Sequence, residues 1–228
     1  MPPALILRKV CGPGHPICHD RASREGIDFL EDASSTDFFW EFAQAEVRDD
    51  GRHDRMYGRG LGPALLARVR LEEREGLTRS QHALLKKTVL STRPEYLRPL
   101  LWLGLRWSFG ELPLKQLPHL RVPNLDIFRP TAPSRLLGDF AAALDQGAPT
   151  LWPPVAENYR RMRPRFKLQR MVGSPIVMGA SSEGPFTIVE GLTRLSVLAS
   201  RLRGGEPVPS GIRLLVGLGP KARDWWCY

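Results

Sequence analysis

Cysteine and long apolar runs are scarce in this sequence. Only three of its 228 residues are cysteine, and their odd number and wide spacing exclude a disulfide-rich secreted scaffold. No run approaches the ~18 apolar residues of a membrane span, and the apolar stretch at residues 4–7 is too short for a signal peptide. We therefore expect a cytoplasmic protein from a reducing compartment, with no membrane partner.

Several motifs of phosphate, acyl and metal chemistry are also missing. The sequence has neither a Gly-x-x-x-x-Gly-Lys-Ser/Thr loop nor a Gly-x-Ser-x-Gly elbow. Four soft metal ligands lie close together near the start: Cys11, His15, Cys18 and His19. Zinc sites usually combine two separated pairs of such ligands, and no second pair follows, so we expect no metal here. The acidic loop at residues 49–54 lacks the ligand series of a calcium loop.

Positive charge is concentrated in the last third of the chain. The sequence is 42% hydrophobic and 25% charged, as in an ordinary globular protein, and its net charge is +9. Residues 150–228 hold 12 Lys and Arg against 5 Asp and Glu, whereas charges nearly cancel in residues 1–149. A polyanionic ligand would therefore meet the C-terminal part. The alternative is a basic surface that only keeps the protein soluble.

The order of expected elements indicates an α+β protein. Helical patterns occur at residues 37–47, 63–75, 78–90, 95–107 and 134–146, and residues 48–62 resemble a loop. After residue 152, a short helix precedes β-type runs at 175–178, 186–189 and 212–216, with a helix at 192–202 before the last run. We expect an irregular arm (1–35), then a helical part (36–149) packed on a small mixed β-sheet in an α/β part (150–228).

The most informative segment is residues 185–198, where a β-type run ends in an acid, turns at a glycine and enters an amphipathic helix. Gly191 permits a sharp turn, and the helix start offers free N–H groups and the positive end of a dipole. Gly191, Thr193 and Arg194 are therefore candidate phosphate ligands. Glu190 is the candidate catalytic residue, which would orient a metal ion or an acceptor. The alternative is structural: Glu190 pairs with Arg194, and the glycine only makes a tight turn.

This segment also carries a family resemblance. Residues 188–195, Ile-Val-Glu-Gly-Leu-Thr-Arg-Leu, resemble the acid-Gly-x-x-Arg box of the ParB/sulfiredoxin-like superfamily, which lies between a strand and a helix. Residues 215–228 resemble the ending of an uncharacterised bacterial branch with a Glu-Gly-x-Thr-Arg box. The resemblance covers residues 170–228 and implies binding of ATP or CTP with Mg²⁺. The histidine of the box is absent, because Leu192 or Thr193 stands in its place, so a proton shuttle or phosphate contact is lost.

A basic stretch precedes the first β-type run of the C-terminal part. It contains six cations and no acid: Arg160, Arg161, Arg163, Arg165, Lys167 and Arg170. Arginine forks suit the oxygens of a triphosphate or a nucleic-acid backbone. We expect this stretch beside the 190–194 turn, where it would steer an anionic ligand. The alternative is a solvated face or a partner surface.

Three functions are consistent with these sequence patterns. We favour nucleotide binding at residues 188–196, whose catalytic form would be an ATP-dependent phosphotransferase or a nucleotide hydrolase. The second function is non-enzymatic DNA or RNA binding by the basic C-terminal third. The third is a partner-binding accessory protein whose nucleotide pocket has decayed. We expect the aromatic residues at 225–228 to plug the core rather than to stack on a base.

Overall fold

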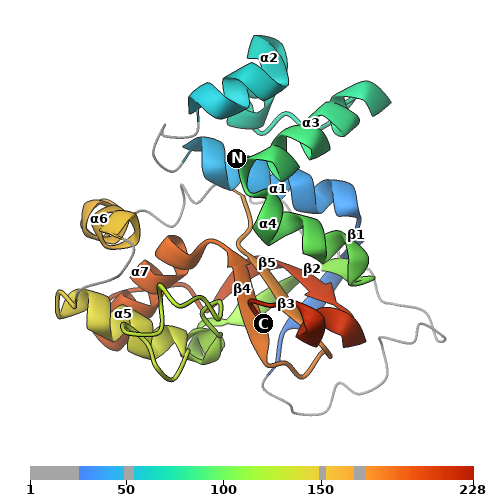
Figure 1. Ribbon diagram of the computed structural model, residues 1–228. Coiled ribbons are helices and arrows are strands. Elements are labelled where there is room, and N and C mark those ends of the chain that lie inside the picture. The colour runs from blue at the N-terminus through green and yellow to red at the C-terminus, as the bar shows by residue number, and fades with distance from the viewer. Residues whose placement is uncertain (1–25, 49–53, 149–152, 167–172) are drawn as a thin grey trace, which may run out of the picture.

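A five-stranded mixed sheet lies at the centre of the protein, with helices on both faces (Figure 1). The computed structural model describes residues 26–48, 54–148, 153–166 and 173–228. Its strands are β1 (Asp28–Ala33), β2 (Arg106–Pro113), β3 (Ile176–Gly179), β4 (Phe186–Glu190) and β5 (Gly211–Leu218). Their order is β1-β2-β5-β3-β4, in which β3 pairs with β5 in parallel and the other neighbours are antiparallel. The two strands nearest the N-terminus, β1 and β2, therefore join the sheet through β5, the strand nearest the C-terminus.

One face of the sheet is covered by helices from the first half of the chain. They are α1 (Ser35–Arg48), α2 (Asp54–Leu71), α3 (Arg79–Thr92), α4 (Pro94–Leu97) and the 3₁₀ helix η1 (Arg98–Trp102). The short η4 (Pro220–Asp224) joins them near the end of the chain. Phe42, Leu85 and Leu97 are fully buried on this side, with Trp225 and Cys227 in the same core. The expectation that the terminal aromatic segment plugs the core is correct for Trp225, whereas Trp226 is 53% exposed.

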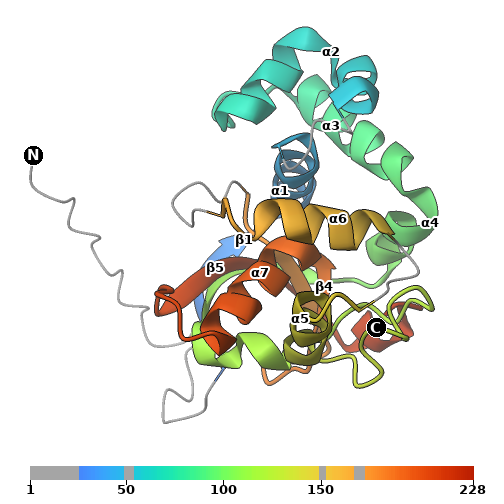
Figure 2. The ribbon, with the colours of Figure 1, turned by 90° about the vertical axis from the view of Figure 1, so that its left-hand side faces the viewer.

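The opposite face is covered by η2 (Leu114–His119), α5 (Leu137–Asp145), α6 (Pro153–Met162) and α7 (Leu192–Arg203). Figure 2 shows α6 lying along α7 on this side. Leu117, Phe140 and Leu195 are buried in this second core. Alternation along β5 serves both cores, because Leu214 and Val216 contribute to this one and Leu215 to the other. The sheet is thus apolar on both faces.

Several sequence expectations are confirmed and others are wrong. The α+β class, the strands β3 to β5, helix α7 and the capping box of Thr78 and Gln81 at the start of α3 all appear. The single helix expected at 95–107 is wrong, because the chain leaves η1 through a left-handed turn at Gly104 and enters β2. The loop expected at 48–62 is also wrong beyond residue 53, where α2 begins.

Two further points bear on the organisation of the chain. β1 lies within the arm expected to be irregular, and β2 lies within the part expected to be helical, so both add strands to the C-terminal sheet. The first 25 residues, with the Cys11–His19 ligand set, and most of the 49–54 acidic loop lie outside the described residues. Among the helices that are described, none combines the length and apolarity needed to cross a bilayer.

Candidate functional site

The turn between β4 and α7 has a backbone that favours glycine. Gly191 has φ +93° and ψ 13°, a left-handed conformation, and it caps α7 without a side-chain hydrogen bond. A Cβ at this position would lie 2.8 Å from the Cβ of Pro175. The strand, turn and helix predicted from the sequence are therefore present, and the turn packs directly on the segment that precedes β3.

Arg194 lies beneath this turn and is only 2% exposed. Its guanidinium forms an ion pair with Glu190, four residues earlier, and donates through Nη1 to the carbonyl oxygen of Gly173 at 2.9 Å. A buried charge is tolerated only when it is paired and hydrogen-bonded, and both requirements are met here. The structural interpretation of Glu190 and Arg194 therefore describes their contacts, and Arg194 fastens the turn to the chain at residue 173.

Thr193 is the predicted ligand that remains partly accessible, since it is half-buried in the first turn of α7. The α7 N-terminus has no side-chain cap, so the first N–H groups of the helix keep their capacity to bind an anion. The phosphate-binding roles of Gly191, Thr193 and Arg194, and the catalytic role of Glu190, remain predictions. For Arg194, contact with a phosphate would require its guanidinium to leave Glu190.

The basic stretch is divided between different surroundings. Arg160, Arg161 and Arg165 are exposed at the end of α6 and just after it, whereas Lys167 and Arg170 lie outside the described residues. Arg163 donates through Nε to the hydroxyl of Ser200 at 3.0 Å and pairs with Glu206. Ser200 lies about 9 Å along α7 from Arg194. Arg163 and Arg194 therefore contact different parts of α7. Gly173, three residues after the last cation of the stretch, contacts the turn through Arg194.

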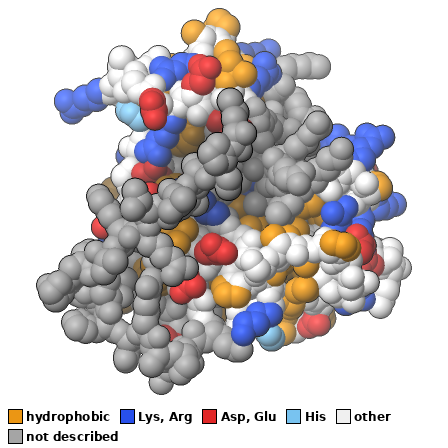
Figure 3. Space-filling view, turned by 180° about the vertical axis from the view of Figure 1, so that it is seen from behind, with side chains coloured by type: hydrophobic (Ala, Val, Ile, Leu, Met, Phe, Trp, Pro, Cys, Tyr) orange, Lys and Arg blue, Asp and Glu red, His pale blue; other side chains and the backbone are white. Residues whose placement is uncertain are grey.

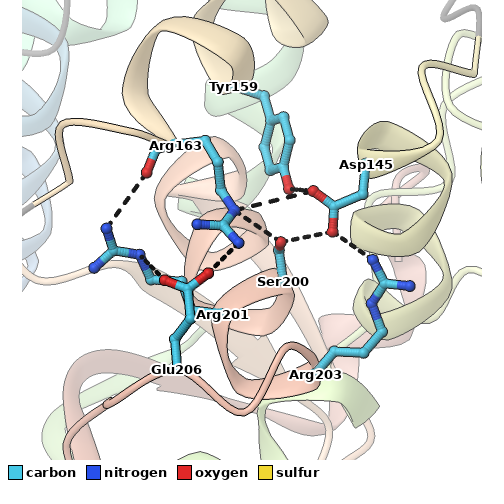
Figure 4. Close-up of polar contacts among 7 residues, drawn as sticks. All are labelled: Asp145, Tyr159, Arg163, Ser200, Arg201, Arg203 and Glu206. Atoms are coloured by element: carbon cyan, nitrogen blue, oxygen red, sulfur yellow. Dashed lines mark hydrogen bonds and ion pairs between the residues drawn. The ribbon is translucent and has the colours of Figure 1, made fainter.

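A polar network joins the three helices of this face (Figure 4). Asp145 of α5 accepts hydrogen bonds from Tyr159, Ser200 and Arg203, and the Ser200 contact measures 2.6 Å. Burial raises the pKa of Asp145, but these hydrogen bonds outweigh it and the pKa is lowered overall. Burial and the bond to Asp145 raise the pKa of Tyr159 to about 12. Ser200 is 1% exposed and its hydroxyl links Arg163 to Asp145, so we assign the Ser200–Asp145 contact to structure.

Ion pairing also engages much of the C-terminal positive charge. Among the described cations of residues 150–228, ion pairs with acids are made by Arg163, Arg194, Arg201, Arg203 and Arg213. Seen from behind, the described surface mixes basic and acidic side chains with apolar ones (Figure 3). The charge asymmetry of the sequence therefore does not appear on this side as one continuous basic face.

Two cavities lie away from the predicted site. A small apolar pocket of about 120 Å³ borders η1 and includes Phe38, Leu100, Leu101 and Trp107 in its lining. Leu101, which lines the pocket, is 38% exposed, and Trp102, the next residue of η1, is 81% exposed. We call Trp102, Leu101 and this pocket the η1 surface. This surface was not predicted from the sequence, because a single helix was expected at residues 95–107.

The second cavity is larger, about 500 Å³, and opens between α1, β1 and the loop after α2. Its lining contains five acids and two arginines, including Glu31, Asp32 and Glu41. Gly173 and Ser174 also line it, so Gly173 separates this pocket from Arg194. We call it the acidic pocket. Sequence motifs gave no sign of it, since its residues come from separate segments.

Comparisons with known proteins add no assignment: no family model, curated protein or solved structure matches the chain. Within the described part of the chain, no group of three or more His, Cys, Asp or Glu side chains is placed to hold a metal ion.

Proposed function

We propose that this chain is a non-catalytic, partner-binding accessory protein that docks a segment of another protein on the η1 surface. The observation that carries the proposal is the 81% exposure of Trp102. Tryptophan offers one of the largest apolar areas of any side chain, and interface hot spots are enriched in it. Trp102 and Leu101 are adjacent in sequence and both exposed, and Leu101 also lines the apolar pocket. The η1 surface thus combines a protruding anchor with a hollow for an apolar side chain of the partner.

Charge around the η1 surface favours an acidic partner segment. Residues 96–110 contain no Asp or Glu, and their two cations, Arg98 and Arg106, are both exposed. The ammonium of Lys86 lies 5.6 Å from the ring centroid of Phe39, which also lines the pocket. A second copy of this chain would bring the same cations face to face, which is unfavourable. A segment with bulky apolar residues flanked by Asp or Glu satisfies both features.

Selection from a displayed peptide library tests this proposal. The full chain should enrich peptides that combine a large apolar residue with acids. Trp102→Ala should weaken the binding of those peptides about 30-fold, the size of a hot-spot loss. Leu71→Ala is the matched control, because Leu71 is 63% exposed and lies outside the η1 surface.

Two outcomes would contradict the proposal. Peptides without an acidic and apolar consensus, or peptides whose affinity Trp102→Ala leaves unchanged, would exclude docking at this surface. A dimer in solution that Trp102→Ala dissociates would assign the surface to a second copy instead. Light scattering of both proteins at several concentrations distinguishes this case.

Nucleotide binding at residues 188–196 is the second candidate, and the uncapped α7 N-terminus favours it. This hypothesis includes a sheet of the ParB/sulfiredoxin-like type and a cytoplasmic location. Thermal shift with ATP, CTP and GTP plus Mg²⁺ tests it, since ligand at 100 times its Kd stabilises a protein by about 2.7 kcal/mol. Thr193→Ala should abolish such a shift. No shift with any nucleotide would exclude this candidate.

Nucleic-acid binding by the C-terminal third remains the third possibility from the sequence. A gel shift with DNA and RNA over a range of salt concentrations tests it, because phosphate contacts make affinity fall steeply with salt. Arg160→Ala and Arg165→Ala change the exposed cations of the basic stretch and should weaken any such complex.

A further inference from the structure

The acidic pocket has a charge opposite to that of the whole molecule. Five carboxylates, those of Glu31, Asp32, Asp37, Glu41 and Glu72, line it, with Arg74 and Arg213 as the cations. The chain as a whole has a net charge of +9. A concave site lined by one sign of charge concentrates ligands of the other sign. The pocket therefore favours a cation, whereas the rest of the molecule repels one.

Gln44 is an independent sign of a ligand in this pocket. Its side chain lines the pocket and is only 3% exposed. No hydrogen bond joins its amide to a described residue, and the amide atoms are not among the fully enclosed ones that lack a partner, so they remain accessible. An amide that has no protein partner keeps its oxygen free to accept a hydrogen bond from an N–H donor in the pocket. Glu41, one helical turn earlier, is 9% exposed and accepts from the backbone N–H of Ser174. A ligand with N–H groups would satisfy Gln44 beside a carboxylate.

Two arginines of the chain itself already pair with acids of the pocket. Arg213 lies 4.1 Å from the ring centroid of Phe109 and pairs with Glu31, so a guanidinium meets an aromatic face and a carboxylate together. On another wall, Arg74 pairs with Asp37. These internal contacts show that the carboxylates and the aromatic ring lining the pocket bind guanidinium groups.

The spread of the acids distinguishes a metal ion from an organic cation. No three described acids or histidines converge on a point that would hold a metal. The carboxylates come instead from β1, α1 and the loop after α2, across a space of about 500 Å³. That volume lies within the range of small-molecule sites. Separated carboxylates suit a molecule with separated positive charges.

We propose that the acidic pocket binds a small linear organic polycation, with ammonium or guanidinium groups at its ends. Gln44 and Glu41 accept hydrogen bonds from one end, and Asp32 faces the other. This site does not depend on docking at the η1 surface, because no residue lines both pockets. Its failure would leave the partner-binding proposal unaffected.

Isothermal titration of the full chain with spermidine and with agmatine tests the site at physiological salt. We expect saturable 1:1 binding of at least one probe. Gln44→Leu should weaken it about tenfold through the lost hydrogen bond to a cation. Asp32→Asn changes an exposed side chain, so the fold should persist, and it should weaken binding about fivefold. Glu157→Gln, an exposed acid on α6, is the matched control and should leave affinity unchanged.

Three results would overturn the proposal. The first is no saturable heat with either probe. The second is affinity that Asp32→Asn and Gln44→Leu leave unchanged while both variants keep the far-UV circular dichroism of the parent. The third is an equal response to Mg²⁺ at the same ionic strength, which would identify the effect as screening of the acids.

Discussion

Position 191 requires glycine for two separate reasons, backbone conformation and packing, and Gly205 provides a comparison. The backbone there is left-handed, which L side chains adopt at a cost of about 1–2 kcal/mol. A Cβ would also press on Pro175. Gly205 shares the positive φ, at +67°, but a Cβ there would have nothing within 4 Å. The two glycines thus differ in packing alone.

Gly191→Ala should therefore lower the free energy of unfolding by more than Gly205→Ala. We expect about 3 kcal/mol for Gly191→Ala, which combines backbone strain with overpacking, and about 1 kcal/mol for Gly205→Ala. Urea unfolding followed by circular dichroism measures both. Equal losses would mean that the contact with Pro175 relaxes without cost.

Arg194 gives a second prediction at the scale of the residue. Arg194→Met removes one partner of a buried pair and leaves the Glu190 carboxylate without it, which should cost about 3–5 kcal/mol of stability. Thr193→Ala, next to it but half-buried, should cost at most about 1 kcal/mol. If Arg194→Met unfolds at the same urea concentration as the parent, its buried contacts are not what holds the turn.

At the scale of elements, Asp145 links α5 to α6 and α7 through side chains rather than through backbone. Tyr159 comes from α6, and Ser200 and Arg203 come from α7. The lowered pKa of Asp145 means that the folded state prefers its charged form. Its contribution to stability is therefore fully present above the unfolded value of 3.8 and is lost as pH falls through the lower folded value.

Asp145→Asn should accordingly flatten the decline of stability between about pH 5 and pH 2. Asp126→Asn is the control, because the ion pair of Asp126 with Arg129 is solvent-exposed and should contribute little. Some decline should persist in Asp145→Asn, since hydrogen bonds from Arg74 and Ser34 outweigh burial and lower the pKa of Asp37 as well. Urea titrations across this pH range give the measurement. An unchanged slope would remove Asp145 from the acid sensitivity of the fold.

Which elements the sequence could predict depends on how local their causes are. The α3 cap and the β4–turn–α7 unit follow from neighbouring residues, and both were found. β2 was missed because Leu97, Leu100 and Leu103 keep a helical spacing almost up to its start. The beginning of α2 was missed because Gly58, Gly60 and Gly62 resemble a loop. Gly60 instead lets α2 approach α3, where a Cβ would lie 2.5 Å from Thr88.

The candidate sites also differ in how local their causes are. The turn at Gly191 was predictable because its residues are consecutive. The environment of Arg194 was not, since Gly173 lies 21 residues away in the sequence. Each cavity is lined by residues from segments that lie far apart in the sequence, so residue spacing gave no sign of them.

At the scale of the whole molecule, the two cores share one sheet and should melt together. Leu137→Ala in one core and Leu85→Ala in the other should each cost about 2–5 kcal/mol, since both side chains are fully buried. Each should shift one common transition, detected alike by tryptophan fluorescence and circular dichroism. The exposed Leu71→Ala should shift it by at most about 0.5 kcal/mol. Two separate transitions would show instead that the halves fold independently.

The pairing of β2 with β5 has a consequence for synthesis of the chain. Each residue of β2, from Arg106 to Pro113, finds its partner between Gly211 and Leu218, about a hundred positions later. Such distant pairing slows folding, because the intervening loop must close before the ladder forms. During synthesis on the ribosome, the edge of β2 that pairs with β5 therefore stays unpaired until β5 emerges. During that interval the nascent protein should depend on chaperones that shield unpaired strands.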